Sequence, residues 1–452
     1  MQSLFTSLSH ISQITDLNLL QKYMTDSSGY TPAMPAVVLR PTNTQEVVDC
    51  IKACVVANKS YTVQGGLTGL AGGATPDEGD VVISLERMNQ IEEIDTIGGT
   101  AIVQAGVVLE QLQQAVLEQG WYFTLDLGAR GSCQIGGNVA TNAGGNKVFR
   151  YGTTRELVLG LEVVLPDGTV LNMLNRVIKN NTGFDLKHLF IGTEGRYGVV
   201  TRICVRLFPK PEAVHNALVA LHSFQDVTLL LKEARASLAE LASFEVMWDS
   251  YMQVATRASK KPHPFENTYP IYVLLEVEGA AHGLHDKFVH FLEQQLHSGL
   301  VQDVVLPQND EQSKNLWKIR DAIGEIFREM RHFVAFDIGV PLKSMQTLID
   351  EVEEAISQQY PHAVNLFFGH LGDGNLHILT GKLQESELAP VDDLVYQITA
   401  KYQGSITAEH GIGRIKKPFL HYSRSSEQIQ LMQSIRTLLN PKNLLNAGRV
   451  VD

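Results

Sequence analysis

The chain of 452 residues has little cysteine and a shortage of positive charge. Its four cysteines (Cys50, Cys54, Cys133 and Cys204) are too few for the disulfide framework of a small secreted protein. Lys and Arg number 37 against 49 Asp and Glu, which gives a formal net charge of -12. Nucleic-acid phosphates attract basic surfaces, so this balance argues against a nucleic-acid partner.

Long apolar runs and targeting signals are also missing. No uninterrupted apolar stretch approaches the roughly 20 residues that span a bilayer. Residues 1–16 lack the basic stretch and apolar run of a signal peptide. The sequence therefore predicts a cytoplasmic protein with no transmembrane segment. Its 44% hydrophobic and 19% charged residues are typical of a folded globular protein.

Three regions differ in their pattern. Residues 1–210 combine short β-branched runs with helical segments, the first of which, 42–59, is expected to be capped by Thr42 or Thr44. Residues 211–385 alternate single strands with long helices, which predicts an α/β domain with an antiparallel sheet covered by helices on one face. Residues 386–452 are predicted to be mostly helical and to contribute to the active site.

Glycine is concentrated in two loops, residues 65–73 and 128–145. A glycine-rich turn after a strand can present a concave array of backbone N–H groups to a phosphate. No helix start follows the first loop and no GxxxxGK[ST] motif occurs, which excludes the Rossmann and P-loop classes. Either loop alone could be only a tight turn. Two such loops in one domain favour a nucleotide-type cofactor.

Two histidines flank a hairpin signal in residues 364–380. The dipeptide Asp373-Gly374 suits a two-residue type I′ turn, which would place His370 directly opposite His377. Opposed side chains project from one face with their Cβ atoms roughly 4.5–5.5 Å apart, so two imidazoles can hold one divalent ion. The alternative is a pair of ordinary histidines on a strand.

A carboxylate that could complete such a site occurs in the turn SITAEHGIGRIKK. His370, His377 and Glu409 would give two imidazoles, one carboxylate and open positions. This is the ligand count of catalytic zinc, although manganese or iron can use the same set. His410 follows Glu409 and is the candidate base, because imidazole titrates near the working pH. A purely structural role for His410 is the alternative.

At least seven segments, in order, resemble a known family of flavoproteins. VQGGLTGLAGGATP, DLGARGSCQIGGNVATNAGGN, RYGTTRELVLGLEVVLPDGTVL and NTGFDLKHLFIGTEGRYGVVTR are similar to the FAD domain of the vanillyl-alcohol-oxidase type. GHLGDGNLHI, AEHGIGRIKK and NPKNLLNAGRV resemble the D-lactate and D-2-hydroxyglutarate dehydrogenase branch. The resemblance implies an α+β fold with a two-subdomain FAD-binding domain (1–210), a substrate-binding domain (211–385) and a helical C-terminal segment (386–452).

The same resemblance implies FAD that is bound without a covalent link. No histidine lies between His10 and His188, so a histidyl link in the first loop is excluded, and a thioether to Cys133 is the minor alternative. The implied pyrophosphate contacts are Gly65, Gly66, Thr68 and Gly69. The other implied cofactor contacts are Ser132, Gly136, Gly137, Asn138, Thr141, Gly145, Glu194, Gly198 and Asn446.

The implied reaction oxidises a D-2-hydroxy acid to the 2-oxo acid. A divalent cation chelated by the substrate would lower the pKa of its hydroxyl group, and the C2 hydride would pass to flavin N5. The family position of Arg320 makes it the expected clamp for the substrate carboxylate. Asn375 is expected to orient the substrate or a histidine ligand. The electrons would leave through an electron-transfer flavoprotein, a quinone or oxygen.

The sequence departs from the 2-hydroxyglutarate enzymes at the implied second-carboxylate site. Gly324, Ala335 and Leu379 stand where Thr, Lys and Asn are expected, so a distal carboxylate would be desolvated without a partner. We therefore expect D-lactate or a larger, apolar substrate such as D-mandelate, with Phe333 and Phe336 lining the pocket or packing in the core. D-2-hydroxyglutarate is the alternative substrate.

Two hypotheses from other functional classes stay open on the sequence alone. A metallohydrolase would use the two histidines and Glu409 to activate water, and the protein would be colourless. A carrier would hold flavin or metal without turnover. A homodimer is a further possibility that the sequence does not decide.

Overall fold

The computed structural model describes residues 8–330 and 332–452. The chain forms two compact units. Unit 1 contains the residues up to Gly145 together with Gly152–Lys210 and Glu409–Asp452. Unit 2 contains Asn146–Tyr151 and Pro211–Ala408. The expected C-terminal segment 386–452 is therefore divided between the two units after Ala408.

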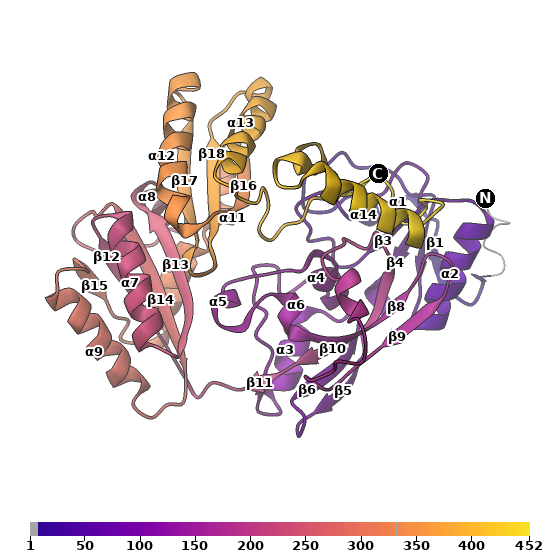
Figure 1. Cartoon of the computed structure of the whole chain (residues 1–452), viewed down its shortest axis with the longest axis horizontal. Helices are drawn as coiled ribbons and strands as arrows, with labels where there is room; N and C mark the ends of the chain where they lie inside the picture. The colour runs from indigo at the N-terminus through magenta and orange to yellow at the C-terminus, as the bar shows by residue number, and fades with distance from the viewer. Residues whose placement is uncertain (1–7, 331) are drawn as a thin grey trace. The chain divides into compact units, whose positions relative to one another are not determined.

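Unit 1 contains two main sheets with a helix between them. In the first sheet, β1-β2-β4-β3, the last three strands are parallel and β1 is an antiparallel edge. The second sheet, β5-β6-β10-β8-β9, is antiparallel. Helix α2 packs against β4 of the first sheet and β8 of the second (Figure 1). The bounds are β1 Ser12–Ile14, α1 Leu17–Leu20, β2 Val37–Arg40, α2 Thr44–Val56, β3 Tyr61–Gln64, β4 Val81–Ser84, β5 Ile91–Asp95, β6 Thr100–Gln104, α3 Leu109–Leu117, β7 Trp121–Tyr122, α4 Ile135–Thr141, α6 Thr154–Leu157, β8 Val158–Val164, β9 Val170–Met173, β10 Val199–Arg206, β11 Phe208–Pro209 and α14 Ser426–Leu439.

Helix α2 shows how local sequence determines an element, and it corrects one expectation. Its N-cap is Asn43, not Thr42 or Thr44, because the Asn43 side chain accepts a hydrogen bond from the backbone N–H of Glu46 at 3.0 Å. Cys50 and Cys54 lie on the buried face of the helix, and burial raises the pKa of both thiols. They therefore pack as small apolar side chains.

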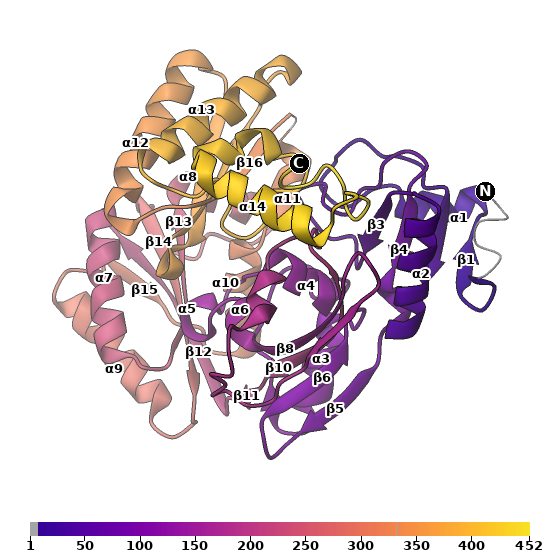
Figure 2. The ribbon, with the colours of Figure 1, turned by 45° about the vertical axis from the view of Figure 1, so that its right-hand side comes forward.

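Unit 2 is built on one seven-stranded antiparallel sheet, in the order β15-β12-β14-β13-β17-β18-β16. Figures 1 and 2 show α7 beside α9 and α12 beside α13. The bounds are α5 Val148–Tyr151, β12 Ala213–Leu221, α7 Phe224–Ser237, β13 Leu241–Trp248, α8 Asp249–Ala258, β14 Ile271–Gly279, α9 Leu284–His297, β15 Asp303–Val305, α10 Asp310–Arg320, α11 Ile323–Glu329, β16 Val334–Gly339, α12 Leu342–Gln359, β17 Val364–His370, β18 Asn375–Gly381 and α13 Leu388–Lys401. Short 3₁₀ turns in the two units are Gln21–Tyr23, Leu85–Arg87, Leu186–Leu189, Leu371–Asp373, Glu385–Glu387 and Lys417–Tyr422.

Helices cover both faces of this sheet, so the expectation of a single covered face is wrong. Trp248 at the end of β13 stacks on Phe224, the first residue of α7, at 6.0 Å between ring centroids. Its neighbour Met247 belongs instead to an apolar cluster with side chains of α8 and α10. Successive side chains of a strand point to opposite faces. Burial on both faces explains why β14 (Ile271–Gly279) is apolar without alternation over most of its length.

The hairpin of β17 and β18 has a different register from the one expected. His377 pairs with Phe368, not with His370. The two-residue turn does not form, because Leu371–Asp373 make a 3₁₀ turn and Gly374 adopts a left-handed conformation with φ 84°. The shift is two residues, and an even shift leaves every side chain on its original face. His370 and His377 therefore still share one face.

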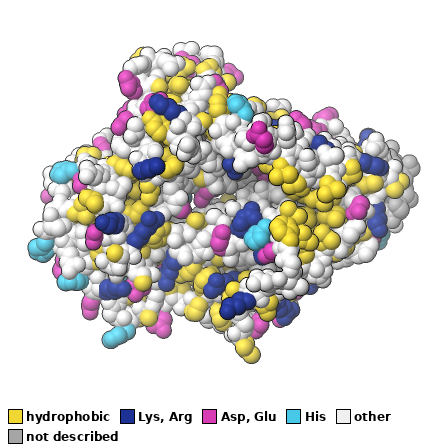
Figure 3. Space-filling model, in the orientation of Figure 1, with side chains coloured by type: hydrophobic (Ala, Val, Ile, Leu, Met, Phe, Trp, Pro, Cys, Tyr) yellow, Lys and Arg dark blue, Asp and Glu magenta, His cyan; other side chains and the backbone are white. Residues whose placement is uncertain are grey.

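The surface carries both signs of charge. Figure 3 shows Lys and Arg side chains interspersed with Asp and Glu on the face drawn. Within the described residues, no helix combines the length and the apolar character that crossing a bilayer demands.

Candidate active site

A buried charge cluster in unit 2 joins three elements of the fold. Glu245 in β13 lies opposite His370 in β17, and its Oε1 is 2.8 Å from the Nδ1 atom of His370. Its Oε2 accepts hydrogen bonds from Arg320 at the end of α10, at 2.7 Å. All three side chains are buried, with Glu245 only 1% exposed. Burial alone would raise the pKa of Glu245, but the charges of His370 and Arg320 lower it below its usual value.

Arg320 lies at a break between two helices. Helix α10 ends at Arg320, and α11 begins at Ile323. The Tyr251 hydroxyl donates to the Arg320 carbonyl at 2.6 Å, which satisfies a group left free by the break. The guanidinium group lies over the Phe368 ring at 5.2 Å. Arg320 is thus held from several sides, unlike an ordinary helical arginine at the surface.

The second histidine lies beside the first on the same face of the sheet. The ring centroids of His370 and His377 are 5.3 Å apart, and the two residues offer ligand atoms within 4.8 Å of each other. The Nδ1 atom of His377 is 3.9 Å from a carboxylate oxygen of the buried Asp337. The spacing of the two imidazoles fits a single divalent cation, so the donor set agrees with the metal implied by the resemblance.

Asn375 adds a polar group without a hydrogen-bond partner. Its side chain is 5% exposed, and neither amide atom has a hydrogen-bond partner among the described residues. Asn375 is two residues from His377 in β18, so both side chains are on one face of the sheet. Leaving a buried amide unpaired costs roughly 1–3 kcal/mol. A ligand that uses this amide would remove the cost, which makes Asn375 a candidate contact as expected.

Glu409 and His410 begin the last stretch of unit 1, directly after the end of unit 2. The last residue of unit 2, Ala408, donates its N–H to the Asp337 carbonyl at 3.0 Å. The Thr407 hydroxyl donates to the Asp337 carboxylate at 3.2 Å. The chain therefore leaves unit 2 from a point bonded to the strand residue that lies opposite His377.

A hollow in unit 1 is lined by residues of β3, α4 and β10, among others, and is partly open to solvent. Gly137 lines the hollow, and a Cβ atom placed on it would meet no protein atom within 4 Å. The buried side-chain oxygens of Gln64 and Gln134 also have no partner among the described residues. These features fit a flavin nucleotide, which would make polar contacts and lie close to the protein backbone.

The loop before this hollow has the expected form of a phosphate site. Within the described chain, no acceptor is found for the backbone N–H groups of Gly66, Leu67, Thr68 and Gly69. Leu67 has φ 59°, a left-handed conformation that costs a branched residue roughly 1–2 kcal/mol. A left-handed residue in a turn aims successive N–H groups at one point, as in anion-binding nests.

The predicted cofactor residues divide into two groups. Those that line the hollow are Gly65, Gly136, Gly137, Glu194, Gly198 and Asn446. Gly66, Thr68, Gly69, Ser132, Asn138, Thr141 and Gly145 do not line it. Some glycines serve packing, because a Cβ atom on Gly145 would lie 1.9 Å from the Asp126 carbonyl oxygen and one on Gly66 would lie 2.1 Å from that of Ser132. Burial raises the pKa of the Cys133 thiol, which disfavours the thiolate that a thioether needs.

Two predicted cofactor residues hold backbone in addition to lining the hollow. The Asn446 amide oxygen accepts from the Val63 N–H at 2.9 Å, and its nitrogen donates to the carbonyls of Glu194 and Gly195. The Glu194 carboxylate accepts from the N–H groups of Ile412 and Gly413 at 2.7 and 2.8 Å. Glu194 therefore fixes the turn that directly follows Glu409 and His410.

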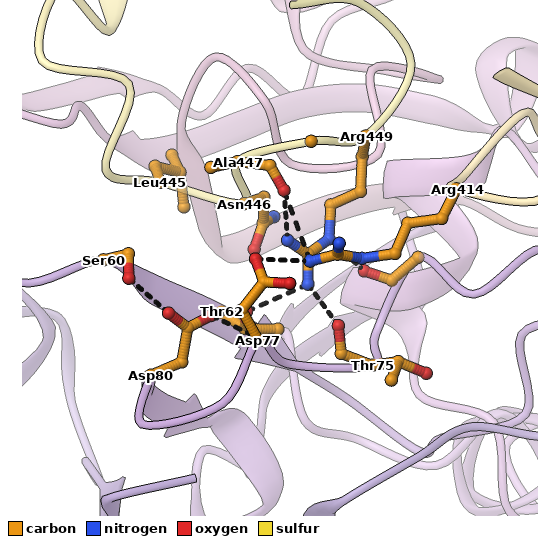
Figure 4. A network of polar contacts seen from close by, with 12 residues as sticks. Ser60, Thr62, Thr75, Asp77, Asp80, Arg414, Leu445, Asn446, Ala447 and Arg449 are labelled. Atoms are coloured by element: carbon orange, nitrogen blue, oxygen red, sulfur yellow. Dashed lines mark hydrogen bonds and ion pairs between the residues drawn. The ribbon is translucent and has the colours of Figure 1, made fainter. Parts of the chain in front are cut away.

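Two buried arginines that sequence patterns did not reveal, Arg449 and Arg196, anchor the C-terminal tail. Arg449 donates to Thr62 and to the carbonyls of Gly73, Thr75 and Ala447 (Figure 4). Arg196 donates to other carbonyls of the same tail, among them those of Leu445 and Asn446. Burial lowers the pKa of each arginine to about 10. No short motif marks such residues, because their partners are carbonyls far away in the sequence.

Comparison with known proteins assigns the chain to a family. Residues 35–174 match the family described as FAD binding domain, and residues 210–450 match FAD linked oxidases, C-terminal domain. The chain belongs to the FAD-linked oxidases. It is an FAD-linked oxidoreductase, and more than half of the residues that line the hollow in unit 1 lie within residues 35–174. The hydrolase reading is therefore not favoured.

Relatives support the branch within this family. The chain is 42% identical over 420 residues to a mitochondrial D-2-hydroxyglutarate dehydrogenase of Bos taurus, covering 92% of this chain and 76% of that protein. It is 36% identical over 423 residues to a putative mitochondrial D-lactate dehydrogenase of Schizosaccharomyces pombe, covering 90% and 80%. The structure of p-cresol methylhydroxylase aligns with TM-score 0.78 at 15% identity, covering 100% of this chain and 95% of that one. The expected vanillyl-alcohol-oxidase fold is confirmed.

Proposed function

We propose that this FAD-linked oxidoreductase oxidises a D-2-hydroxy acid to the 2-oxo acid with the help of a divalent cation. The observation that carries the proposal is one face of the unit 2 sheet, where two imidazoles lie side by side and Arg320 of helix α10 approaches His370. The Asn375 amide on this face has no hydrogen-bond partner among the described residues. These groups match the three needs of such a substrate: a cation for its carboxylate, ligands for a metal at its hydroxyl, and an amide to orient it.

Each residue has a definite task in this proposal. Bound FAD would supply a two-electron acceptor, and a bound cation held by His370, His377 and Glu409 would supply a Lewis acid. Arg320 binds the substrate carboxylate. Asn375 donates to or accepts from the substrate oxygens. His410, which follows the proposed ligand Glu409 in the sequence, takes the hydroxyl proton.

The metal can be tested without changing the chain. Dialysis against a strong chelator is expected to lower kcat/KM for the substrate by at least roughly 100-fold, while the visible flavin spectrum stays. Adding zinc should restore activity, with manganese and iron as the alternatives to compare. Full activity in protein shown by elemental analysis to be free of metal would contradict the metal role and leave FAD chemistry intact.

The substrate side group is proposed to be uncharged. Ala335 and Leu379 pair directly between β16 and β18, so their side chains share one face with Asp337 and His377. A Cβ atom on Gly324 would meet no protein atom within 4 Å. None of the three positions offers a cation or a hydrogen-bond donor side chain. Phe333 stacks on Phe327 at 4.5 Å between ring centroids and Phe336 packs against Tyr396, which supports the packing alternative for both rings.

Substrate comparison tests this preference. We expect kcat/KM for D-lactate or D-mandelate to exceed that for D-2-hydroxyglutarate by at least roughly tenfold, since an unpaired buried carboxylate is costly. The variant Ala335→Lys, alone and with Gly324→Thr, should raise relative activity on D-2-hydroxyglutarate, with Ala335→Met as a size-matched neutral control. A wild-type preference for D-2-hydroxyglutarate would overturn the side-group proposal.

D-2-hydroxyglutarate itself is the second candidate substrate. The observation in its favour is that the bovine relative carries this activity in its name at 42% identity over most of the chain. The same kinetic comparison decides between the two. An electron-transfer flavoprotein or a quinone is the proposed acceptor, and a cytoplasmic location stays a prediction.

A further inference from the structure

We propose that Glu245 is a positioning residue. It fixes the orientations of the His370 and Arg320 side chains at the same time, with one carboxylate oxygen for each. Oε1 contacts Nδ1 of His370 at 2.8 Å, and Oε2 lies 2.7 Å from Nε and from Nη2 of Arg320. The inference rests on the function proposed above. It adds a residue outside the metal and substrate contacts that fixes the spacing between a metal ligand and the carboxylate clamp.

The contact to His370 selects the nitrogen that can bind a cation. An imidazole that donates its Nδ1–H to a carboxylate keeps the Nε2 lone pair for a metal, and the contact also stops the ring from turning. His370 is 7% exposed, and its ring meets His377 edge-on at an angle of 78°. Glu245 approaches His370 from the neighbouring strand β13, opposite in register. The carboxylate thus holds the ring in one tautomer and one orientation.

The contact to Arg320 leaves one edge of the guanidinium group for a ligand. A guanidinium has two edges that can grip a carboxylate with two parallel hydrogen bonds. Glu245 occupies the Nε–Nη2 edge. The Nη1–Nη2 edge has only longer contacts: Nη1 is 3.6 Å from an Asp321 carboxylate oxygen, and Nη2 is 3.3 Å from the ring nitrogens of His370. In this proposal that edge faces the substrate carboxylate, with its direction set by Glu245. Since both contacts come from one carboxylate, a displacement of Glu245 moves the metal ligand and the clamp together.

Stability alone does not account for a glutamate at this place. Position 245 is central in a strand that is buried on both faces, and its neighbours Phe244 and Val246 are apolar. Replacing a buried ion pair by apolar side chains of similar volume is often neutral or stabilising. A charged group thus stands where an apolar core would serve as well, which supports a functional role for Glu245.

The test compares Glu245→Gln with a matched control, Glu278→Gln. Glu278 is also 1% exposed and ion-paired, but its partners are Lys147 and Tyr151, away from Arg320 and His370. We expect Glu245→Gln to weaken zinc binding by roughly 10- to 100-fold, measured on flavin-loaded protein by competition with a chromogenic chelator. Glu278→Gln is expected to stay within twofold of the wild type.

A second measurement tests the contact between Glu245 and Arg320. Pyruvate binding to metal-saturated protein, followed by the change in the flavin spectrum, is expected to weaken by roughly tenfold in Glu245→Gln. Glu245→Asp keeps the charge with a shorter arm that reaches one partner only, and serves if the glutamine variant does not fold. It should lose either zinc or pyruvate affinity at an unchanged melting temperature.

The outcomes separate this inference from the function it rests on. Wild-type affinities for zinc and pyruvate in both Glu245 variants would overturn the positioning role and leave the proposed function standing. A wild-type protein that turns over D-2-hydroxy acids without binding any metal would overturn the proposed metal site, and the His370 arm with it.

Discussion

The hollow in unit 1 and the charge cluster in unit 2 are built from opposite materials. The hollow is lined mainly by glycines, apolar side chains and neutral amides, with the Glu194 carboxylate among them. No acceptor is found among the described residues for several N–H groups of its neighbouring loop. The cluster in unit 2 uses Glu245, Arg320, His370 and Asp337, all buried side chains that carry or can carry charge. A large ligand that stays in place is held well by many backbone contacts. A small ligand that must be oriented and deprotonated needs a few charged groups set by one another.

The largest effect is expected at the imidazole pair. His370→Ala or His377→Ala should lower kcat/KM by roughly 1,000-fold, about 4 kcal/mol, because each removes one metal ligand. Flavin content, read from the visible spectrum, should stay at one per chain, since the hollow is in the other unit. Loss of flavin together with activity would show that the two sites are not built independently.

The second-largest effect is expected at Arg320, the proposed clamp for the substrate carboxylate. Arg320→Lys keeps the charge but loses the planar fork, so kcat/KM should fall by roughly 100-fold, about 3 kcal/mol, mostly through KM for the 2-hydroxy acid. Steady-state kinetics on metal-saturated protein measures the split. A change confined to the melting temperature, with normal kinetics, would reduce Arg320 to a structural ion-pair partner.

A single methyl group can test the hollow. Gly137→Ala adds a Cβ atom where the protein has none within 4 Å, so the apoprotein should be as stable as the wild type or slightly more so, since Ala favours a helix. FAD affinity should fall by roughly tenfold, measured by flavin fluorescence on rebinding. Gly128→Ala, which also meets no atom but lies outside the hollow, is the control. Equal FAD affinity in both variants would remove Gly137 from the cofactor contacts.

A smaller effect is expected at Glu194, which joins the hollow to the turn after His410. Glu194→Gln loses an acceptor for either the Ile412 or the Gly413 N–H group, a cost of roughly 1–3 kcal/mol. We expect kcat to fall by roughly tenfold through a looser turn, with FAD content and KM little changed. A selective loss of FAD would show that Glu194 acts mainly as a cofactor contact, and that its support of the turn is the lesser role.

The smallest effect is expected outside both sites, at Glu86. Burial alone would raise the pKa of Glu86, but hydrogen bonds from Lys22 and Tyr23 lower it overall. A lowered folded pKa adds stability above the unfolded pKa of roughly 4.5, and this stability is lost as the pH falls through the lowered value. Glu86→Gln should cost about 1 kcal/mol at pH 7 and nothing near pH 2, with unchanged kinetics. Urea unfolding at both pH values measures it.

The sequence determined much of the chemistry of this protein. The two glycine loops and the histidine hairpin are local patterns, so a tight glycine-rich turn after β3 and the shared face of His370 and His377 could be predicted without a structure. The prediction of a shared face is correct although the predicted register is wrong. The register differs by two residues, and an even shift leaves each side chain on the same face of the sheet. The sequence segments that resemble the flavoprotein family also predicted the family of the chain, and the comparisons confirm this prediction.

Only the tertiary structure decided which distant residues hold these groups. Glu245 is 125 residues from His370, and Arg449 is 387 residues from Thr62, so no spacing along the chain reveals either contact. The Arg320 carbonyl at the helix break accepts a hydrogen bond from Tyr251, a residue of another helix. The physical reason is that a local pattern fixes the face on which a side chain lies, while its partner, its orientation and its burial come from strands and helices that the fold alone brings together.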